Sequence, residues 1–160
     1  MKCGIIGNKG IFLPSYKEKY SDNFYEDFEQ PILDMIWENY TYFICGFKEG
    51  IESETAKFIS KIKEEEYQHI SLEIVLPYVP NTQNWRDNCY LDYLKTTWKC
   101  DKKTIISPQK INSMEKRDQY IIDQSDTLLF YWNGRKKGGI WKSIQYAQSC
   151  GKSLRFIMLH

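Results

Sequence analysis

Short apolar runs along the chain alternate with longer stretches in which apolar residues recur every three or four positions. A short apolar run between turn residues predicts a β-strand, and a spacing of three or four predicts an amphipathic helix. The distance from one run to the next leaves room for one helix, which is typical of βαβ units. The predicted strands are residues 3–6, 42–45, 70–76, 104–106, 127–131 and 154–159.

The helices are predicted at residues 24–36, 51–67, 85–98, 112–124 and 140–149. Pro31 lacks a backbone donor, so it predicts a kink or two short helices in the first stretch. In the third stretch, one apolar face is expected to point inward, and it consists of Tyr90, Leu91, Leu94 and Trp98. The alternation of elements predicts one α/β domain over residues 1–160, a Rossmann-like three-layer sandwich with a mostly parallel sheet of about six strands.

The charge balance argues against two classes of partner. Lys plus Arg number 22 and Asp plus Glu number 21, which leaves a net charge of +1. Proteins that bind nucleic acid or membrane surfaces usually carry a basic excess, so neither partner is expected. No apolar run approaches the ~20 residues of a membrane span. Aromatic residues make up 16% of the chain, and this excess favours a homodimer or a higher homo-oligomer.

Cysteine and histidine usage limits the chemistry that can be expected. The five cysteines are scattered without a Cys-x-x-Cys pair, and there are only two histidines, His69 and His160. This pattern predicts reduced thiols in a cytoplasmic protein, and the N-terminal sequence is not expected to be a signal peptide. A metal site and a histidine-based nucleophile are both disfavoured, and no cofactor is expected.

The first two candidate sites follow the first two predicted strands, because open parallel sheets bind ligands beyond the carboxyl ends of their strands. After the first strand, glycines either form a tight turn or let backbone N–H groups approach a phosphate. After the second strand, Glu52 either complements the dipole of the following helix or holds a ribose hydroxyl. The candidate ligand-binding residues here are Gly7, Asn8, Lys9, Gly46, Phe47, Gly50 and Glu52.

Two further loops follow later strands. Pro77, Tyr78 and Trp85 form a stiff segment whose rings either stack on a base or pack in the core. After the fifth strand, a diglycine opens the last helix and predicts an anion site built by Asn133, Gly138, Gly139 and Ile140. The basic loop 135–137 is either an anion contact or a solvated turn. Arg117 is expected to supply further donors, and Asp126 either caps a turn or takes part in chemistry.

In their order along nearly the whole chain, these segments resemble the SLOG superfamily, which joins the DNA-processing protein DprA, the cytokinin-activating LOG hydrolases and the YpsA-like proteins. The resemblance is closest to the YpsA-like branch. It is carried by GIIGNKG, GFKEGIE, PYVPNTQNW, IIDQSDTLLFYWNG and GGIWKSIQYAQSCGKSL. It implies a Rossmann-like fold, and proteins of this kind are thought to act as ligand sensors or effectors.

The LOG branch implies a specific reaction, cleavage of the N-glycosidic bond of a nucleoside monophosphate. Met114 to Arg117 is similar to the Met-x-x-Arg helix of that branch, and Gly138-Gly139 to its glycine loop. The chain departs from the pattern because Lys142 or Ser143 stands where LOG enzymes carry a glutamate. A carboxylate there would support an oxocarbenium-like transition state. Weak substitutes for the catalytic group are Glu52, Asp126 and Arg117.

The leading hypothesis is therefore a sensor or effector domain that binds a nucleotide-derived small molecule without LOG-type hydrolysis. The first alternative is an N-glycosidic hydrolase that acts on a nucleotide or an NAD-like substrate. The second is a regulatory module that interacts with other proteins through its aromatic surface. A carboxylate near the diglycine would favour the hydrolase, and a large exposed aromatic patch would favour the interaction module.

Overall fold

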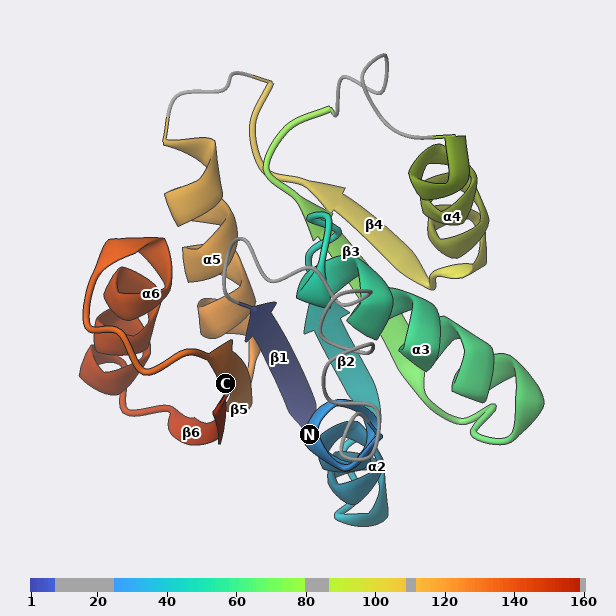
Figure 1. The fold of residues 1–160 in the computed structure, drawn as a ribbon, viewed down its shortest axis with the longest axis horizontal. Coiled ribbons are helices and arrows are strands. Elements are labelled where there is room, and N and C mark those ends of the chain that lie inside the picture. The colour runs from blue at the N-terminus through green and yellow to red at the C-terminus, as the bar shows by residue number, and fades with distance from the viewer. Residues whose placement is uncertain (8–24, 80–86, 109–111, 159–160) are drawn as a thin grey trace.

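The fold is built on one parallel six-stranded sheet. The computed structural model describes residues 1–7, 25–79, 87–108 and 112–158. The strand order is β4-β3-β2-β1-β5-β6, and every neighbouring pair is parallel (Figure 1). The strands are β1 (Lys2–Gly7), β2 (Tyr42–Cys45), β3 (Ser71–Leu76), β4 (Lys102–Ile105), β5 (Thr127–Trp132) and β6 (Ser153–Met158). The predicted α/β class with a parallel sheet is confirmed.

Helices connect the strands in the predicted order. They are the π-helical turn η1 (Tyr25–Glu29), α2 (Gln30–Trp37), α3 (Ile51–Glu65), α4 (Asp87–Lys99), α5 (Ser113–Gln124) and α6 (Gly138–Ser149). Pro31 stands in the first turn of α2, where a backbone N–H is not needed, so the first stretch is divided as predicted. Gly151 ends the last helix with a φ of 67°, which is the left-handed backbone that glycine adopts most easily.

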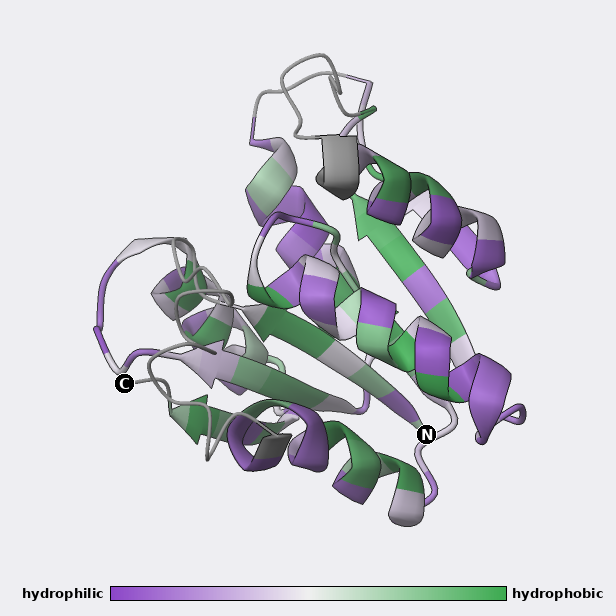
Figure 2. Cartoon of the chain, turned by 45° about the vertical axis from the view of Figure 1, so that its right-hand side comes forward, coloured by the Kyte–Doolittle hydropathy of each residue, from purple (hydrophilic) through white to green (hydrophobic). Residues whose placement is uncertain are grey.

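Two cores cover the two faces of the sheet. On one face, Phe28, Ile32 and Ile59 from η1, α2 and α3 pack against alternate strand residues. On the other face, α5 and α6 pack against the intervening strand residues, with Ile121 and Ile144 buried. Figure 2 shows the apolar residues of the inner strands lying between these layers. Burial on both faces explains the continuous apolar runs of β1 and β5.

The predictions for β4 and α4 were wrong in detail. β4 begins two residues before the predicted start and carries Lys102 and Lys103, because it is an edge strand with only partial cover. The apolar face predicted to point inward on α4 is exposed, and its Trp98 is 90% exposed. Among the α4 side chains that the structure describes, the buried ones are Tyr93 and Thr96. Asp92 and Lys99 add ion pairs with Lys57 and Glu64 of α3, so α4 lies against α3 at the edge of the sheet.

The order of the strands determines where a ligand site is expected. The chain moves outward from β1 through β2 and β3 to β4, and α5 then carries it back to β5 on the other side of β1. β1 and β5 are therefore neighbours at a topological switch point, with Gly7 opposite Tyr131 at their carboxyl ends. Open α/β sheets form their ligand crevices at such a point. Within the described residues, no helix has the length and apolar character needed to cross a membrane.

The burial of each cysteine should determine how readily its thiol reacts. Burial raises the pKa of the Cys3 thiol to about 12, although Arg155 acts in the opposite direction, and burial also raises the pKa of the Cys45 thiol. At about pH 8, roughly one Cys3 thiol in ten thousand is then a thiolate. We expect iodoacetamide to label exposed Cys150 long before Cys3 or Cys45, and urea to remove the difference. Mass spectrometry of timed samples measures this order, and equal labelling of Cys3 and Cys150 in the native protein would contradict it.

Candidate functional site

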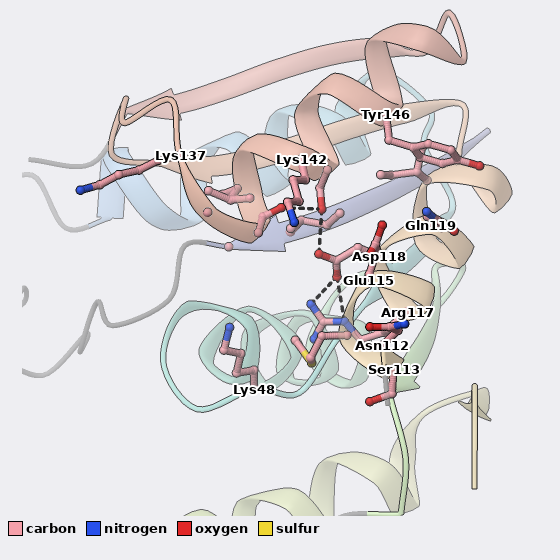
Figure 3. Close-up of a pocket in the computed structure, with 18 residues that line it drawn as sticks. Lys48, Asn112, Ser113, Glu115, Arg117, Asp118, Gln119, Lys137, Lys142 and Tyr146 are labelled. Atoms are coloured by element: carbon pink, nitrogen blue, oxygen red, sulfur yellow. Dashed lines mark hydrogen bonds and ion pairs between the residues drawn. The ribbon is translucent and has the colours of Figure 1, made fainter. Parts of the chain in front are cut away.

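A cavity of about 570 Å³ lies at the switch point, between α5 and α6 (Figure 3). Its size is within the range of small-molecule sites. Ile6 and Gly7 from the end of β1 form one wall, and Lys48 reaches it from the loop between β2 and α3. The first turns of α5 and α6 form the other walls. The cavity is therefore at the edge of the sheet where the sequence predicts ligand binding.

The N-terminus of α6 opens directly onto this cavity. Gly138 and Gly139 both line it, and no side chain caps the helix at Lys137. Gly138 has a φ of 81°, which restricts this position to glycine. Gly139 has no such constraint, and a Cβ added there would meet nothing within 4 Å. Backbone N–H groups of the first helical turn are thus accessible to an anion.

Lysines from different segments line the same cavity, and they are Lys48, Lys137 and Lys142. In Figure 3 the Lys142 side chain lies near Asp118, whereas that of Lys137 extends away from it. Their charges add to the positive end of the α6 dipole. Glu115 and Asp118 also line the cavity, so its electrostatic character is mixed. An anionic group is favoured near α6, while the α5 side also presents carboxylates.

A buried ion pair lies beside the cavity and connects the two faces of the sheet. The Nη1 and Nη2 atoms of Arg117 donate to Oε2 and Oε1 of Glu52, each over 2.7 Å. Both side chains are only 2% exposed. Arg117 also donates from Nε and Nη2 to Oδ1 of Asp118, over 2.9 and 2.7 Å. Burial lowers the pKa of Arg117, but the two carboxylates outweigh it and raise that pKa overall.

Gly46 makes this ion pair possible. A Cβ on Gly46 would lie 2.4 Å from both Nη1 of Arg117 and Oε2 of Glu52, which is too close for any side chain. Glu52 begins α3 on one face of the sheet, and Arg117 belongs to α5 on the other. The two meet over the end of β2, at the edge that also carries the cavity. Gly46 therefore leaves space for an ion pair, whereas the sequence predicts that it leaves space for a ligand.

Replacing Gly46 by alanine should destabilise the protein by about 1–3 kcal/mol, because the added methyl group forces Arg117 and Glu52 apart. Gly139→Ala is the matched control, since the same methyl group meets no atom there. Urea denaturation of both variants measures the difference. Equal stability of the two variants would show that Arg117 and Glu52 do not need this space.

Ser143 extends the buried network to α6. Its Oγ donates to Oδ2 of Asp118 over 2.8 Å, so Glu52, Arg117, Asp118 and Ser143 link α3, α5 and α6. The sequence indicated Arg117 and Glu52 but not their pairing, and it did not indicate Asp118 as a site residue. Neighbouring residues of a helix do not normally face each other, so the Arg117–Asp118 contact has no sequence signal.

Several predicted site residues lie elsewhere. Asp126 precedes β5 at the amino-terminal edge of the sheet, where its Oδ2 accepts from the backbone N of Lys2 over 2.8 Å. It does not line the cavity, and this contact agrees with the turn role, while its role as a substitute catalytic group stays a prediction. Phe47 is buried against Tyr93, with ring centroids 5.5 Å apart, and does not line the cavity.

The remaining predicted residues have mixed placements. Asn133 accepts from the backbone N of Arg135 in a turn, and neither it nor Pro77 and Tyr78 lines the cavity. Gly50 precedes α3 with a φ of 112°, which explains the glycine. Gly7, Arg117, Gly138, Gly139 and Ile140 do line the cavity. Asn8, Lys9 and Trp85 lie outside the described residues.

Metal-binding chemistry has no support in the part of the chain that the structure describes. Among those residues, no group of three or more His, Cys, Asp or Glu side chains is placed to hold a metal ion. The donors around the cavity are backbone N–H groups and lysines, which suit an anion better than a cation.

Comparison with known proteins gives a consistent result. The sequence model of the YpsA family, described as the YspA SLOG family, matches residues 10–157. The chain is 26% identical over 114 residues to UPF0398 protein BH1768 of Halalkalibacterium halodurans, covering 69% of this chain and 60% of that protein. It is 23% identical over 139 residues to UPF0398 protein ABC2016 of Shouchella clausii, covering 84% of this chain and 74% of that protein. The match to the first relative thus spans less than two thirds of its length.

Proposed function

The chain belongs to the YspA SLOG family, and from this premise we propose that it binds a nucleotide-derived small molecule in the cavity between α5 and α6. One observation carries the proposal: α6 begins with two glycines, without a side-chain cap, at a cavity on the switch point of the sheet. A phosphate is the natural ligand of such a helix N-terminus, because N–H groups and the helix dipole both favour negative charge.

The rest of the cavity suits the remainder of a nucleotide. Ile6, Ile122, Ile140 and Tyr146 provide apolar and aromatic surface, while Lys142 adds positive charge close to the start of α6. Such a mixture of apolar walls and a few polar groups is typical of small-molecule sites. Because the donors are backbone N–H groups and lysines, binding should not require a metal ion.

The test is isothermal titration of the full chain with a panel of mono- and dinucleotides, with and without a chelator. We expect at least one adenine-type nucleotide or related phosphate ester to bind, with the same affinity in both conditions. Failure of every member to bind, or binding that disappears with the chelator, would overturn the proposal.

A binding protein of this kind would act as a sensor or effector in the cytoplasm, as a homodimer or a higher homo-oligomer. The exposed apolar residues of α4, Leu91, Leu94 and Trp98, support self-association because such a surface is costly in water. Light scattering coupled to gel filtration tests this part. A monomer at all concentrations would exclude it without affecting the ligand site.

We expect little or no hydrolysis of nucleoside monophosphates. Ser143, or Lys142 if the alignment shifts by one residue, stands in the place of the LOG glutamate, Glu52 is held by Arg117, and Asp126 lies at the other edge. Loss of a general acid or base typically lowers a rate by about 10²–10⁴-fold. Chromatography of AMP incubated with the protein measures release of adenine.

Robust release of adenine would contradict this expectation and favour the hydrolase. Loss of that release in Asp118→Asn would identify Asp118 as the carboxylate, since it lines the cavity and contacts Ser143.

A further inference from the structure

We propose that Asp118, together with Ser143, recognises the hydroxyl groups of a pentose and makes the cavity selective for ribosyl phosphates over their 2-deoxy counterparts. This inference rests on the proposed function and names the ligand class more closely. Asp118 lines the cavity, its side chain is 12% exposed, and it lies on the α5 wall opposite α6. A carboxylate in that position accepts hydrogen bonds and repels phosphate.

The hydrogen bonds of Asp118 leave room for a ligand. A carboxylate has about four acceptor positions. Oδ1 receives two hydrogen bonds from Arg117, and Oδ2 receives one from Ser143. These hydrogen bonds use both acceptor positions of Oδ1 but only one of the two on Oδ2, so Oδ2 can accept one more hydrogen bond, from a ligand.

Ser143 can release a second acceptor position. Its Oγ lies 2.8 Å from Oδ2 of Asp118 and 3.1 Å from the carbonyl oxygen of Gly139, and its single proton can satisfy only one of them well. If a ligand hydroxyl donates to Oδ2, the serine proton can turn to Gly139. Two neighbouring ligand hydroxyls can then meet Oδ2 of Asp118 and Oγ of Ser143.

The buried network holds Asp118 in place for this role. Arg117 is fixed by two hydrogen bonds to Glu52, and it donates two more to Oδ1 of Asp118. Asp118 is thus restrained from turning toward the cavity lysines. With a 2-deoxy ligand, Oδ2 keeps only the hydrogen bond from Ser143 and its second acceptor position is left without a donor, which lowers the affinity for that ligand.

The positions of the charges match a sugar phosphate. One guanidinium between the carboxylates of Glu52 and Asp118 leaves the network with a net negative charge, while the start of α6 is positive. Gly139 and Ser143 are one helical turn apart, about 6 Å along α6. A pentose with an anionic group at one end can place that group at the start of α6 and its hydroxyls at Asp118 and Ser143. A polyphosphate without hydroxyls has no group that can donate to Asp118.

The experiment compares ribose 5-phosphate with 2-deoxyribose 5-phosphate, and AMP with 2′-deoxy-AMP, by isothermal titration. For the wild type we expect a preference of about 10–100-fold for the ribosyl form, the effect of one hydrogen bond to a charged group. Asp118→Asn should reduce this preference to within about twofold, because the amide nitrogen no longer accepts. Ser143→Ala should reduce it partly.

Glu38→Gln is the matched control. It makes the same carboxylate-to-amide change beside an arginine, Arg155, but Glu38 does not line the cavity and is not part of the network that positions Asp118. We expect it to keep the ribosyl preference, and thermal melting shows that each variant is folded at the titration temperature. An equal loss of preference in Glu38→Gln and Asp118→Asn would overturn the direct role of Asp118.

The remaining outcomes separate this inference from the proposed function. Equal binding of ribosyl and 2-deoxyribosyl forms to the wild type would overturn the inference and leave nucleotide binding intact. Binding of none of the sugar phosphates and nucleotides would overturn both.

Discussion

Replacing Arg117 by methionine should lower the free energy of unfolding by about 3–5 kcal/mol, which is the usual cost of removing one partner from a buried ion pair. Glu52 and Asp118 would then lose four hydrogen bonds from Arg117 and face each other without a positive charge between them. Since Glu52 is only 2% exposed, water cannot replace the guanidinium. Urea denaturation followed by tryptophan fluorescence measures the loss.

Neutralising the carboxylates should restore much of the lost stability. The triple variant Arg117→Met, Glu52→Gln, Asp118→Asn carries no unpaired buried charge, so we expect it to be more stable than Arg117→Met alone. Arg155→Met is the control at the more exposed pair with Glu38, where solvent screening makes the expected loss much smaller. If Arg117→Met and Arg155→Met lose the same stability, the buried network does not hold α3, α5 and α6 together.

The sequence predicts the sheet well because both of its faces are buried. β1 and β5 are continuous apolar runs with a helix on either side, and their ends are visible in the sequence. The same reasoning fails for α4, because it assumes that an apolar helical face is covered. In the described residues, Leu91 and Trp98 face solvent while Thr96 is buried. Which face of an edge helix is covered depends on the neighbouring elements, and a single sequence does not contain that information.

The candidate site was predicted in its position but not in its contacts. The rule that parallel strands share one carboxyl edge brings Gly7, Gly46 and Gly138 to the same side of the molecule, as the sequence indicated. The partners of Arg117 were not predictable, because Glu52 lies 65 residues away and belongs to the opposite face of the sheet. The position of Asp126 before the fifth strand was predictable, but its contact with the backbone of Lys2 was not, because that contact joins residues 124 positions apart.

Replacing Gly139 by aspartate should reduce the affinity for the nucleotide or sugar phosphate by at least about 100-fold while leaving the protein as stable or more stable. The new carboxylate would occupy the first turn of α6, where its negative charge competes with the ligand phosphate for the same N–H groups. The same charge complements the helix dipole by about 0.3–1 kcal/mol, and loss of a glycine reduces the entropy of the unfolded chain. No atom lies within 4 Å of the added Cβ, so the fold can accept the side chain.

Gly139→Asn separates charge from size, because the amide has nearly the same volume as the carboxylate but no charge. We expect Gly139→Asn to lose about tenfold in affinity, and the difference between the two variants to shrink as salt concentration rises. Titration calorimetry gives the affinities, and thermal melting gives the stability of each unliganded variant. The decisive result is that Gly139→Asp loses affinity while its stability is unchanged or raised. A variant that merely unfolds would lose both affinity and stability. Wild-type affinity in Gly139→Asp would mean that the phosphate is bound away from α6, and the proposed site would then have to be abandoned.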